Sequence, residues 1–393
     1  MKIKLLVCFS LIFLLSGCYN YRELNDIAIV SAIGIEKKDD LYNMTFQIMN
    51  TKKGGNDGNS AESQPKFITY NESGKTIQGI SRKIISESPR RLYLNHVQVL
   101  IISEELAKDG IIDILDWFAR DSESQKDFYV LISKDPNKVL STLTSIETLN
   151  SKKIADNIKT NSKFLGTTEE TTFEDVLATY INDKQELTLP SIKLSGNIKS
   201  SDQSSNIETS NPEAKIYLSN TAVFKDDKML GYLTNDESLA INFIKNKIKN
   251  TIIEYKCDDK NYITSEIFNV KTKLEIEKDK IPTVKIKVKG NANINEINCD
   301  LDLENSKIIK KINNDLEKEI KNLITSSIYS VNNKYNTDIY GFEDLFYKKD
   351  TKNYEKIKEN WDDNFKNLNI DVNVDINLSE KGTILRVIKH AKK

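Results

Sequence analysis

The hydrophobic and polar positions of the chain repeat with two periods, which predict strands in some stretches and helices in others. Strict alternation of apolar and polar residues over 370–378 predicts a half-buried strand, and 284–289 alternates apolar residues with lysines. Over 308–331 the apolar residues recur at helical spacing and predict one long amphipathic helix, through Ile309, Ile312, Leu316, Ile320, Leu323, Ile324 and Ile328. The chain should therefore contain both helices and sheets.

The first half of the chain alternates short elements of the two kinds. The predicted strands are 27–36, 42–49, 67–70, the run from His96 to Ser103, 128–132 and 187–194. The predicted helices begin at Ser73 and at Ile111, with further helical segments at 139–149, 152–160 and 173–181. A Gly-, Asn- and Ser-rich stretch at 52–64 is typical of an exposed loop.

The predicted fold class is α+β, with three modules that are each a mainly antiparallel sheet flanked by helices, after a cleaved lipoprotein signal peptide. The expected divisions are a signal peptide at 1–17, an N-terminal α+β domain at 18–197, a Ser/Asn-rich linker at 198–212, a small middle α+β domain at 213–260 and a C-terminal α+β domain with the long helix at 261–393.

The first residues have the pattern of an export signal that ends in a lipid anchor. Lys2 and Lys4 precede an apolar run over 5–15, which is shorter than the about 20 residues that span a bilayer. Leu15, Ser16, Gly17 and Cys18 resemble the lipobox of bacterial lipoproteins, in which the cysteine receives an S-diacylglyceryl group and an N-acyl chain such as palmitate. We therefore expect a protein anchored on a membrane. The alternative is an ordinary secretory signal with an incidental cysteine.

Composition limits the partners and the redox chemistry. The 393 residues carry 57 basic and 58 acidic side chains, a balance that argues against nucleic acid as a partner. Of the four cysteines, Cys257 and Cys299 remain in the folded part. They could form a disulfide outside the cytoplasm. Two buried thiols are the simpler expectation, because sequence does not show that their Cα atoms approach.

No set of residues predicts catalysis, a metal site or a cofactor. The two histidines, His96 and His390, are too few for a histidine-rich metal site, and neither a Gly-x-Ser-x-Gly turn nor a phosphate-binding loop is present. His96 is expected to be a partly buried polar residue. Arg90 and Arg91 could bind a phosphate or carboxylate, although pairing with an acid on a helix is the simpler expectation. Lys285, Lys287 and Lys289 could approach lipid head groups, but a solvated sheet face is expected.

Several blocks, in order along the chain, resemble the Ger(x)C spore-germination lipoproteins. They are Cys18 to Asp26 followed by Ala28 to Ile35, Ser88 to Leu94 with His96, Leu100 to Ala107, Gly110 to Asp116 with Arg120-Asp121, Ala222 to Lys225 with Gly231 to Leu233, and Tyr335, Asp338, Ile339, Gly341, Phe342, Trp361 and Phe365. The chain departs from the family in having Tyr19 where Trp is usual and Glu343 where a second Gly is usual.

The resemblance implies a non-catalytic C subunit of a nutrient germinant receptor. Such a subunit lies on the outer face of the spore inner membrane beside two polytopic membrane subunits, has three α+β domains, and would act in receptor assembly and signal transmission during germination. Whether it binds germinant directly stays open. Within the matching blocks, our own candidates for partner contact are Arg90, Arg91, His96, Asp338, Gly341 and Phe342. The alternatives are a solute-binding lipoprotein of a transporter and, in a third class, a cell-wall hydrolase with an acid pair.

Overall fold

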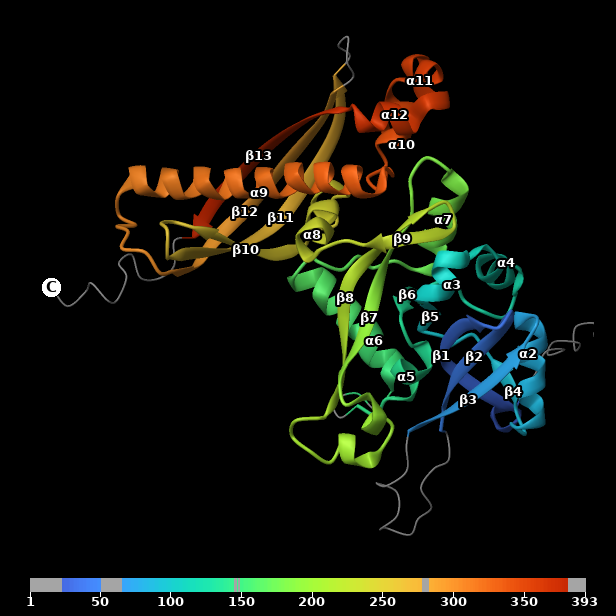
Figure 1. Ribbon diagram of the computed structural model, residues 1–393. Coiled ribbons are helices and arrows are strands. Elements are labelled where there is room, and N and C mark those ends of the chain that lie inside the picture. Colours follow the sequence, from blue (N-terminus) through green and yellow to red (C-terminus); the bar gives the residue numbers. More distant parts are fainter. Residues whose placement is uncertain (1–22, 51–65, 145–146, 148, 278–282, 381–393) are drawn as a thin grey trace, which may run out of the picture.

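The computed structural model describes residues 23–50, 66–144, 147, 149–277 and 283–380, which form two units built on separate sheets (Figure 1). The first unit comprises the described residues of 23–233 and contains a nine-stranded sheet. The second unit comprises the described residues of 234–380 and contains a four-stranded sheet. The signal peptide, Cys18 and residues 383–388, where the sequence predicts a last strand, lie outside the described residues.

The first sheet is mixed, with β1 in its interior. Its strand order is β3 (Phe67–Gly74), β2 (Leu41–Met49), β1 (Ile27–Lys38), β5 (Val99–Ser103), β6 (Tyr129–Ser133), β7 (Thr188–Gly196), β8 (Ala214–Lys225) and β9 (Lys228–Tyr232). The short strand β4 (Arg91–Tyr93) pairs in parallel with the start of β1. The pairs β1–β5, β5–β6 and β6–β7 are also parallel, and the remaining pairs are antiparallel.

Helices cover both faces of this sheet. On one face lie α5 (Pro136–Ser141) and α6 (Asn150–Phe164), and on the other lie α2 (Ile77–Lys83), α3 (Glu104–Asp109), α4 (Ile112–Arg120) and α7 (Phe173–Asn182). Along β5, Val99 and Ile101 join one core while Leu100 and Ile102 join the other, so the strand is apolar on both sides. Short 3-10 turns occur at Leu24–Asp26, Ile84–Ser86, Ile198–Ser200 and Ser204–Asn206.

The Ser/Asn-rich segment 198–212 is the loop of a hairpin within the first unit. It connects β7 and β8, which are antiparallel neighbours. Asn206 is 1% exposed, and its side-chain amide donates hydrogen bonds to the carbonyl oxygens of Leu143 and Ala214. The polar composition that suggests a linker therefore serves here to satisfy buried backbone groups.

The second sheet is covered by the long helix predicted from the sequence. Its order is β10 (Asn250–Lys256), β11 (Tyr262–Glu277), β12 (Thr283–Ile297) and β13 (Asn369–Glu380), with β12 and β13 parallel. The helix α9 (Ser306–Tyr335) packs with α8 (Asn235–Ile244) against the apolar face. Three short helices, α10 (Phe342–Lys349), α11 (Thr351–Ile357) and α12 (Trp361–Lys366), with a 3-10 turn at Lys358–Asn360, complete the unit.

The lysine-rich face of β12 is neutralised by acids on neighbouring strands. Lys287 pairs with Glu275 at 2.6 Å, Lys285 with Glu277 at 2.8 Å and Lys289 with Asp375 at 2.8 Å. Hydrogen bonds from Lys273 and Lys287 lower the pKa of Glu275 to about 2. The prediction of a solvated sheet face is confirmed, and these lysines do not form an unpaired cationic patch.

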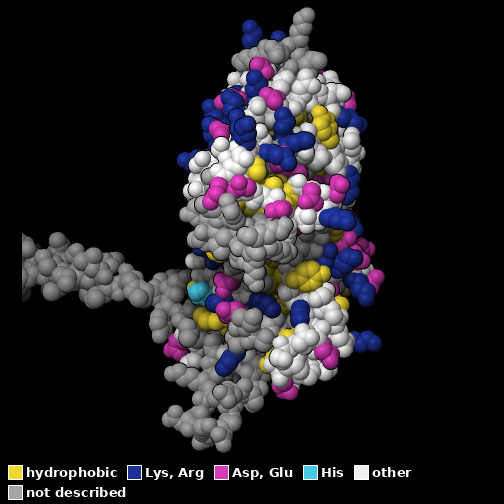
Figure 2. Space-filling view, turned by 90° about the vertical axis from the view of Figure 1, so that its left-hand side faces the viewer, with side chains coloured by type: hydrophobic (Ala, Val, Ile, Leu, Met, Phe, Trp, Pro, Cys, Tyr) yellow, Lys and Arg dark blue, Asp and Glu magenta, His cyan; other side chains and the backbone are white. Residues whose placement is uncertain are grey.

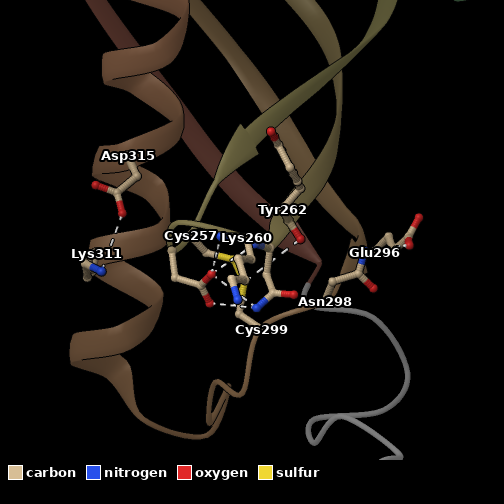
Figure 3. Close-up of a disulfide and its surroundings, with 10 residues drawn as sticks. Cys257, Lys260, Tyr262, Glu296, Asn298, Cys299, Lys311 and Asp315 are labelled. Atoms are coloured by element: carbon tan, nitrogen blue, oxygen red, sulfur yellow. Dashed lines mark hydrogen bonds and ion pairs between the residues drawn. A yellow bond between two sulfur atoms is a disulfide. The ribbon is translucent and has the colours of Figure 1, made fainter.

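Cys257 and Cys299 form a disulfide, so the expectation of two free thiols is wrong (Figure 3). Their Cα atoms lie 6.5 Å apart. Cys257 directly follows β10, and Cys299 comes two residues after β12. The first residue of β11, Tyr262, lies next to the disulfide. Sequence cannot foresee this pairing, because it depends on the antiparallel register that brings the two strand ends together.

The α+β class is confirmed, and the helices flank two sheets where the sequence predicts three. Strands β8 and β9 extend the first sheet and β10 begins the second, so residues 213–260 contain no sheet of their own. The first sheet is also mixed where mainly antiparallel pairing was expected. Hydrophobic periodicity predicts strands one at a time, but strand partners are fixed by long-range packing.

Candidate partner-contact site

The chain enters the described structure next to one of the predicted contact segments. Strand β4 pairs with the first three residues of β1, matching Ile27 with Arg91 and Ile29 with Tyr93. Glu23 lies five residues after Cys18, a span of at most about 17 Å for an extended chain. Within the described residues, no helix has both the length and the apolar character needed to cross a bilayer.

Arg91 is held in place by an acid, as the sequence suggested. Its guanidinium Nη2 donates to Glu123 Oε1 at 2.6 Å, and Glu123 lies in the loop after α4 rather than on the helix itself. A cavity of about 220 Å³ lies beside this pair and is also lined by Arg82 and Trp117. Before the strand, the hydroxyl of the buried Ser88 donates to the carbonyl oxygen of Arg90 and so fixes the turn.

His96 is exposed, which corrects the expectation of a partly buried residue. Its ring contacts that of Tyr93 edge-on, with centroids 5.7 Å apart. The side-chain amide of Asn95 donates to the Tyr93 hydroxyl at 2.7 Å. The strand predicted to begin at His96 begins instead at Val99, and this leaves His96 in the turn before it.

Asp338, by contrast, is buried and acts within the chain. It is 5% exposed, and its carboxylate accepts backbone N–H groups from Tyr340 at 3.1 Å, Gly341 at 3.0 Å and Glu343 at 2.7 Å. Burial raises the pKa of Asp338 to about 6, although these hydrogen bonds oppose the rise. Gly341 has φ of +78° and caps α10, a conformation that favours glycine.

The segment around Asp338 joins the two units. The Glu186 backbone N–H donates to the Asp338 carbonyl oxygen at 2.9 Å, and a Cβ at Gly341 would lie 3.0 Å from the side chain of Gln185. Phe342 is fully buried and stacks on Tyr340. Asp338 and Phe342 therefore stabilise the junction between the units and present almost no exposed surface to a partner.

Other residues of the family-like blocks meet at the same junction. The hydroxyl of Tyr335 donates to the carbonyl oxygen of Tyr232 at 2.8 Å. A Cβ at Gly231 would lie 2.6 Å from that hydroxyl oxygen, so the close approach requires glycine. Lys225 and Asp362 add an ion pair at 2.5 Å. Blocks that are more than a hundred residues apart in the sequence thus form one contact.

Glu186 is a junction residue that the sequence did not single out. Burial raises its pKa to about 7, and the nearby charges of Asp226 and Asp338 act in the same direction. One of its carboxylate oxygens accepts the backbone N–H of Asp226 at 2.8 Å. In the sequence Glu186 stands in a polar run after α7, where nothing distinguishes it from a surface glutamate.

The predicted contact residues thus fall into two groups that the fold keeps apart. Arg90, Arg91 and His96 lie around β4 in the first unit, whereas Asp338, Gly341 and Phe342 lie before and at the start of α10 in the second, and Figure 1 shows these elements far from one another. On the face in Figure 2, basic and acidic side chains are interspersed and the hydrophobic side chains form only small separate patches.

Comparison with known proteins matches nearly the whole chain to one family. Residues 20–194 match the spore germination protein N-terminal domain, and residues 219–382 match the spore germination B3/GerAC-like C-terminal domain. Spore germination protein KC of Bacillus subtilis (strain 168) is 29% identical over 96% of this chain and 95% of its own length. Spore germination protein B3 of the same strain is 21% identical over 97% of this chain and 98% of its own length.

A solved structure agrees with the fold. The crystal structure of the GerBC protein superposes with a TM-score of 0.54 and 17% identity, covering 88% of this chain and 96% of that one. The family models, the full-length relatives and the shared α+β fold all point to one assignment: the chain belongs to the Ger(x)C family of spore germination proteins.

Proposed function

We propose that this chain is the lipid-anchored C subunit of a nutrient germinant receptor, held by Cys18 on the outer face of the spore inner membrane. It acts without catalysis, beside two polytopic membrane subunits, in receptor assembly and in passing on the signal of germinant binding. The family assignment supports the receptor role, and the lipobox-like residues Leu15, Ser16 and Gly17 support the anchor.

One observation carries the proposal beyond family membership. The β4 edge, with Arg91, Tyr93 and the exposed His96, pairs with the first residues of the body after Cys18. A short tether would hold that edge close to the bilayer, within reach of membrane-embedded subunits. The anchor would also raise the local concentration of the chain near those subunits. Arg90, Arg91 and His96 remain our candidates for partner contact.

The anchor is tested by replacing its thiol. Cys18→Ala should release the protein from the spore membrane fraction and impair germination through this receptor, because neither acyl chain could be attached. Cys8→Ala is the matched control, since it changes a cysteine within the apolar run of the signal and leaves the lipobox intact. Fractionation with immunoblotting and germination assays give the readout. Retention of the Cys18→Ala protein on the membrane would refute the proposed anchor.

A further inference from the structure

A cavity of about 470 Å³ lies between the two units. The first unit contributes α7 and residues 185–188, and the second contributes the end of α8, the middle of β11 and α10. The volume falls in the range of small-molecule sites, about 300–1,000 Å³. This junction cavity is distinct from the β4 edge, and Tyr340 and Gly341, which donate N–H groups to Asp338, form part of its wall.

The acidic side chains that line the junction cavity are already paired. Glu169 binds Lys245 at 3.2 Å, with both side chains largely buried, and Asp344 binds Lys348 at 2.6 Å. Asp175 belongs to the capping box of α7 and accepts the backbone N–H of Thr172 at 2.9 Å. Lysines therefore balance the charges of Glu169 and Asp344, whereas Asp175 keeps its negative charge, so the four lysines of the lining exceed its three acids by one.

Two other lysines that line the cavity are not paired with an acidic side chain. Among the described residues, neither Lys247, in the segment after α8, nor Lys349, at the end of α10, has an ion-pair partner. Both side chains are exposed. Their two positive charges face the solvent around a concave site, and such an arrangement attracts an anion.

Buried hydroxyl groups give the cavity unsatisfied hydrogen-bonding capacity. Thr171 lines the cavity, is 5% exposed, and its hydroxyl has no hydrogen-bond partner. The hydroxyl of Thr272, which also lines it, is likewise buried and unpartnered. Unsatisfied buried hydroxyls are costly, and a small shift of the wall that opens either hydroxyl to the cavity would let a ligand oxygen relieve that cost. The rest of the lining includes Leu187, Ile244, Leu274 and Leu345, which suit an apolar ligand body.

We propose that the junction cavity binds a small organic anion, with a carboxylate or phosphate group near Lys247 and Lys349 and a compact apolar body. Because Thr171 and α7 come from the first unit and both lysines from the second, the bound anion joins the units and stabilises one arrangement of them. The proposal rests on the cavity alone and does not depend on the receptor function proposed above.

The experiment uses fluorinated probes and the full-length chain. Binding of 4-fluorobenzoate and 4-fluorophenyl phosphate is followed by ¹⁹F NMR, with 4-fluorobenzylamine as a cationic probe of the same shape. The anions should bind saturably, and the tighter of the two identifies the preferred head group. Lys247→Ala with Lys349→Ala should weaken binding about tenfold or more, because two charge-assisted contacts are lost. The matched control is Lys318→Ala with Lys321→Ala, two exposed lysines on α9.

Thr171→Val provides a second test, because it keeps the shape of the side chain and removes only the hydroxyl. Weaker anion binding with an unchanged melting temperature supports the site. Three results would overturn the proposal: no saturable binding of either anion up to about 10 mM, which corresponds to a negligible affinity; equal binding of the cationic probe; or full binding by the Lys247→Ala, Lys349→Ala protein.

Discussion

Glu186 shows how a single carboxyl group makes the junction between the units sensitive to pH. The ordinary pKa of a glutamate is 4.5, and burial raises that of Glu186 to about 7. Between these values the folded chain holds a proton that the unfolded chain has lost. The free energy of unfolding therefore falls as pH rises through this range, and the loss is complete above about pH 7. Asp338, with a pKa of about 6, adds a loss of the same sign at lower pH.

Glu186→Gln should remove this dependence. Glutamine keeps an oxygen that accepts the Asp226 N–H and carries no charge at any pH. We expect the variant to be more stable than the natural chain at pH 8 by about 1 kcal/mol, a figure reduced for the partial exposure of the group. Near pH 5 the two chains should differ little. Urea unfolding from pH 5 to 8 measures this, with Glu319→Gln on the exposed face of α9 as control. Parallel pH profiles for the two chains would contradict it.

Residue by residue, the sequence located important positions more often than it identified their roles. The family resemblance singles out Asp338, Gly341 and Phe342, which are our candidates for partner contact by sequence. In the structure they contact other parts of the same chain, and backbone N–H groups surround the carboxylate of Asp338. Arg91 did pair with an acid. His96, expected to be partly buried, is exposed, and Glu186, which nothing in the sequence singled out, is half-buried at the junction. Burial of a single polar side chain depends on distant segments, and local sequence does not record it.

At the scale of elements, α9 contributes the apolar stripe that covers the second sheet. Ile320 is fully buried at its centre. Ile320→Ala should lower the free energy of unfolding by about 2–5 kcal/mol, through lost burial and the cavity left behind. Lys321→Ala changes the next, exposed residue and should have almost no effect. Denaturant unfolding of both variants gives the comparison, and equal midpoints would show that the stripe is not the source of stability.

The disulfide closes the second sheet at one end of β11. It links cysteines 42 positions apart, and closing a loop of that length stabilises a chain by about 3–4 kcal/mol. The Cys257→Ala, Cys299→Ala chain should therefore unfold at lower denaturant concentration. Dithiothreitol should lower the midpoint of the natural chain to that of the variant and leave the variant unchanged. An effect of the reductant on the variant would show that its action lies elsewhere.

Elements with strong local periodicity were the predictable ones. The helix expected over 308–331 and the strand expected over 370–378 are present as α9 and β13, each slightly longer. The helix expected to open at Ser73 begins at Ile77 instead, because Thr76 caps it and β3 extends to Gly74. Helix ends depend on which hydroxyl reaches the first free N–H groups, and Ser73 and Thr76 are both residue types that cap helices.

At the scale of the whole molecule, the arrangement of the two units could not be read from the sequence. The division of residues 213–260 between two sheets depends on β8 pairing with β7 and on β10 pairing with β11. The junction cavity also depends on the arrangement of the two units, because the walls of the cavity come from segments between Glu169 and Lys349. The family resemblance identified the blocks that build the junction, and only the fold shows that they meet.

The position of β1 has a mechanical consequence. Any pull on the N-terminus enters the body along this strand, which lies inside the sheet and is hydrogen-bonded to β2, β4 and β5. A force along a strand loads all of these hydrogen bonds at once in shear, whereas a force across a strand at the sheet edge breaks them one after another. The first unit should therefore transmit tension from the tether proposed at Cys18 as a stiff body, and yield last where the chain enters it.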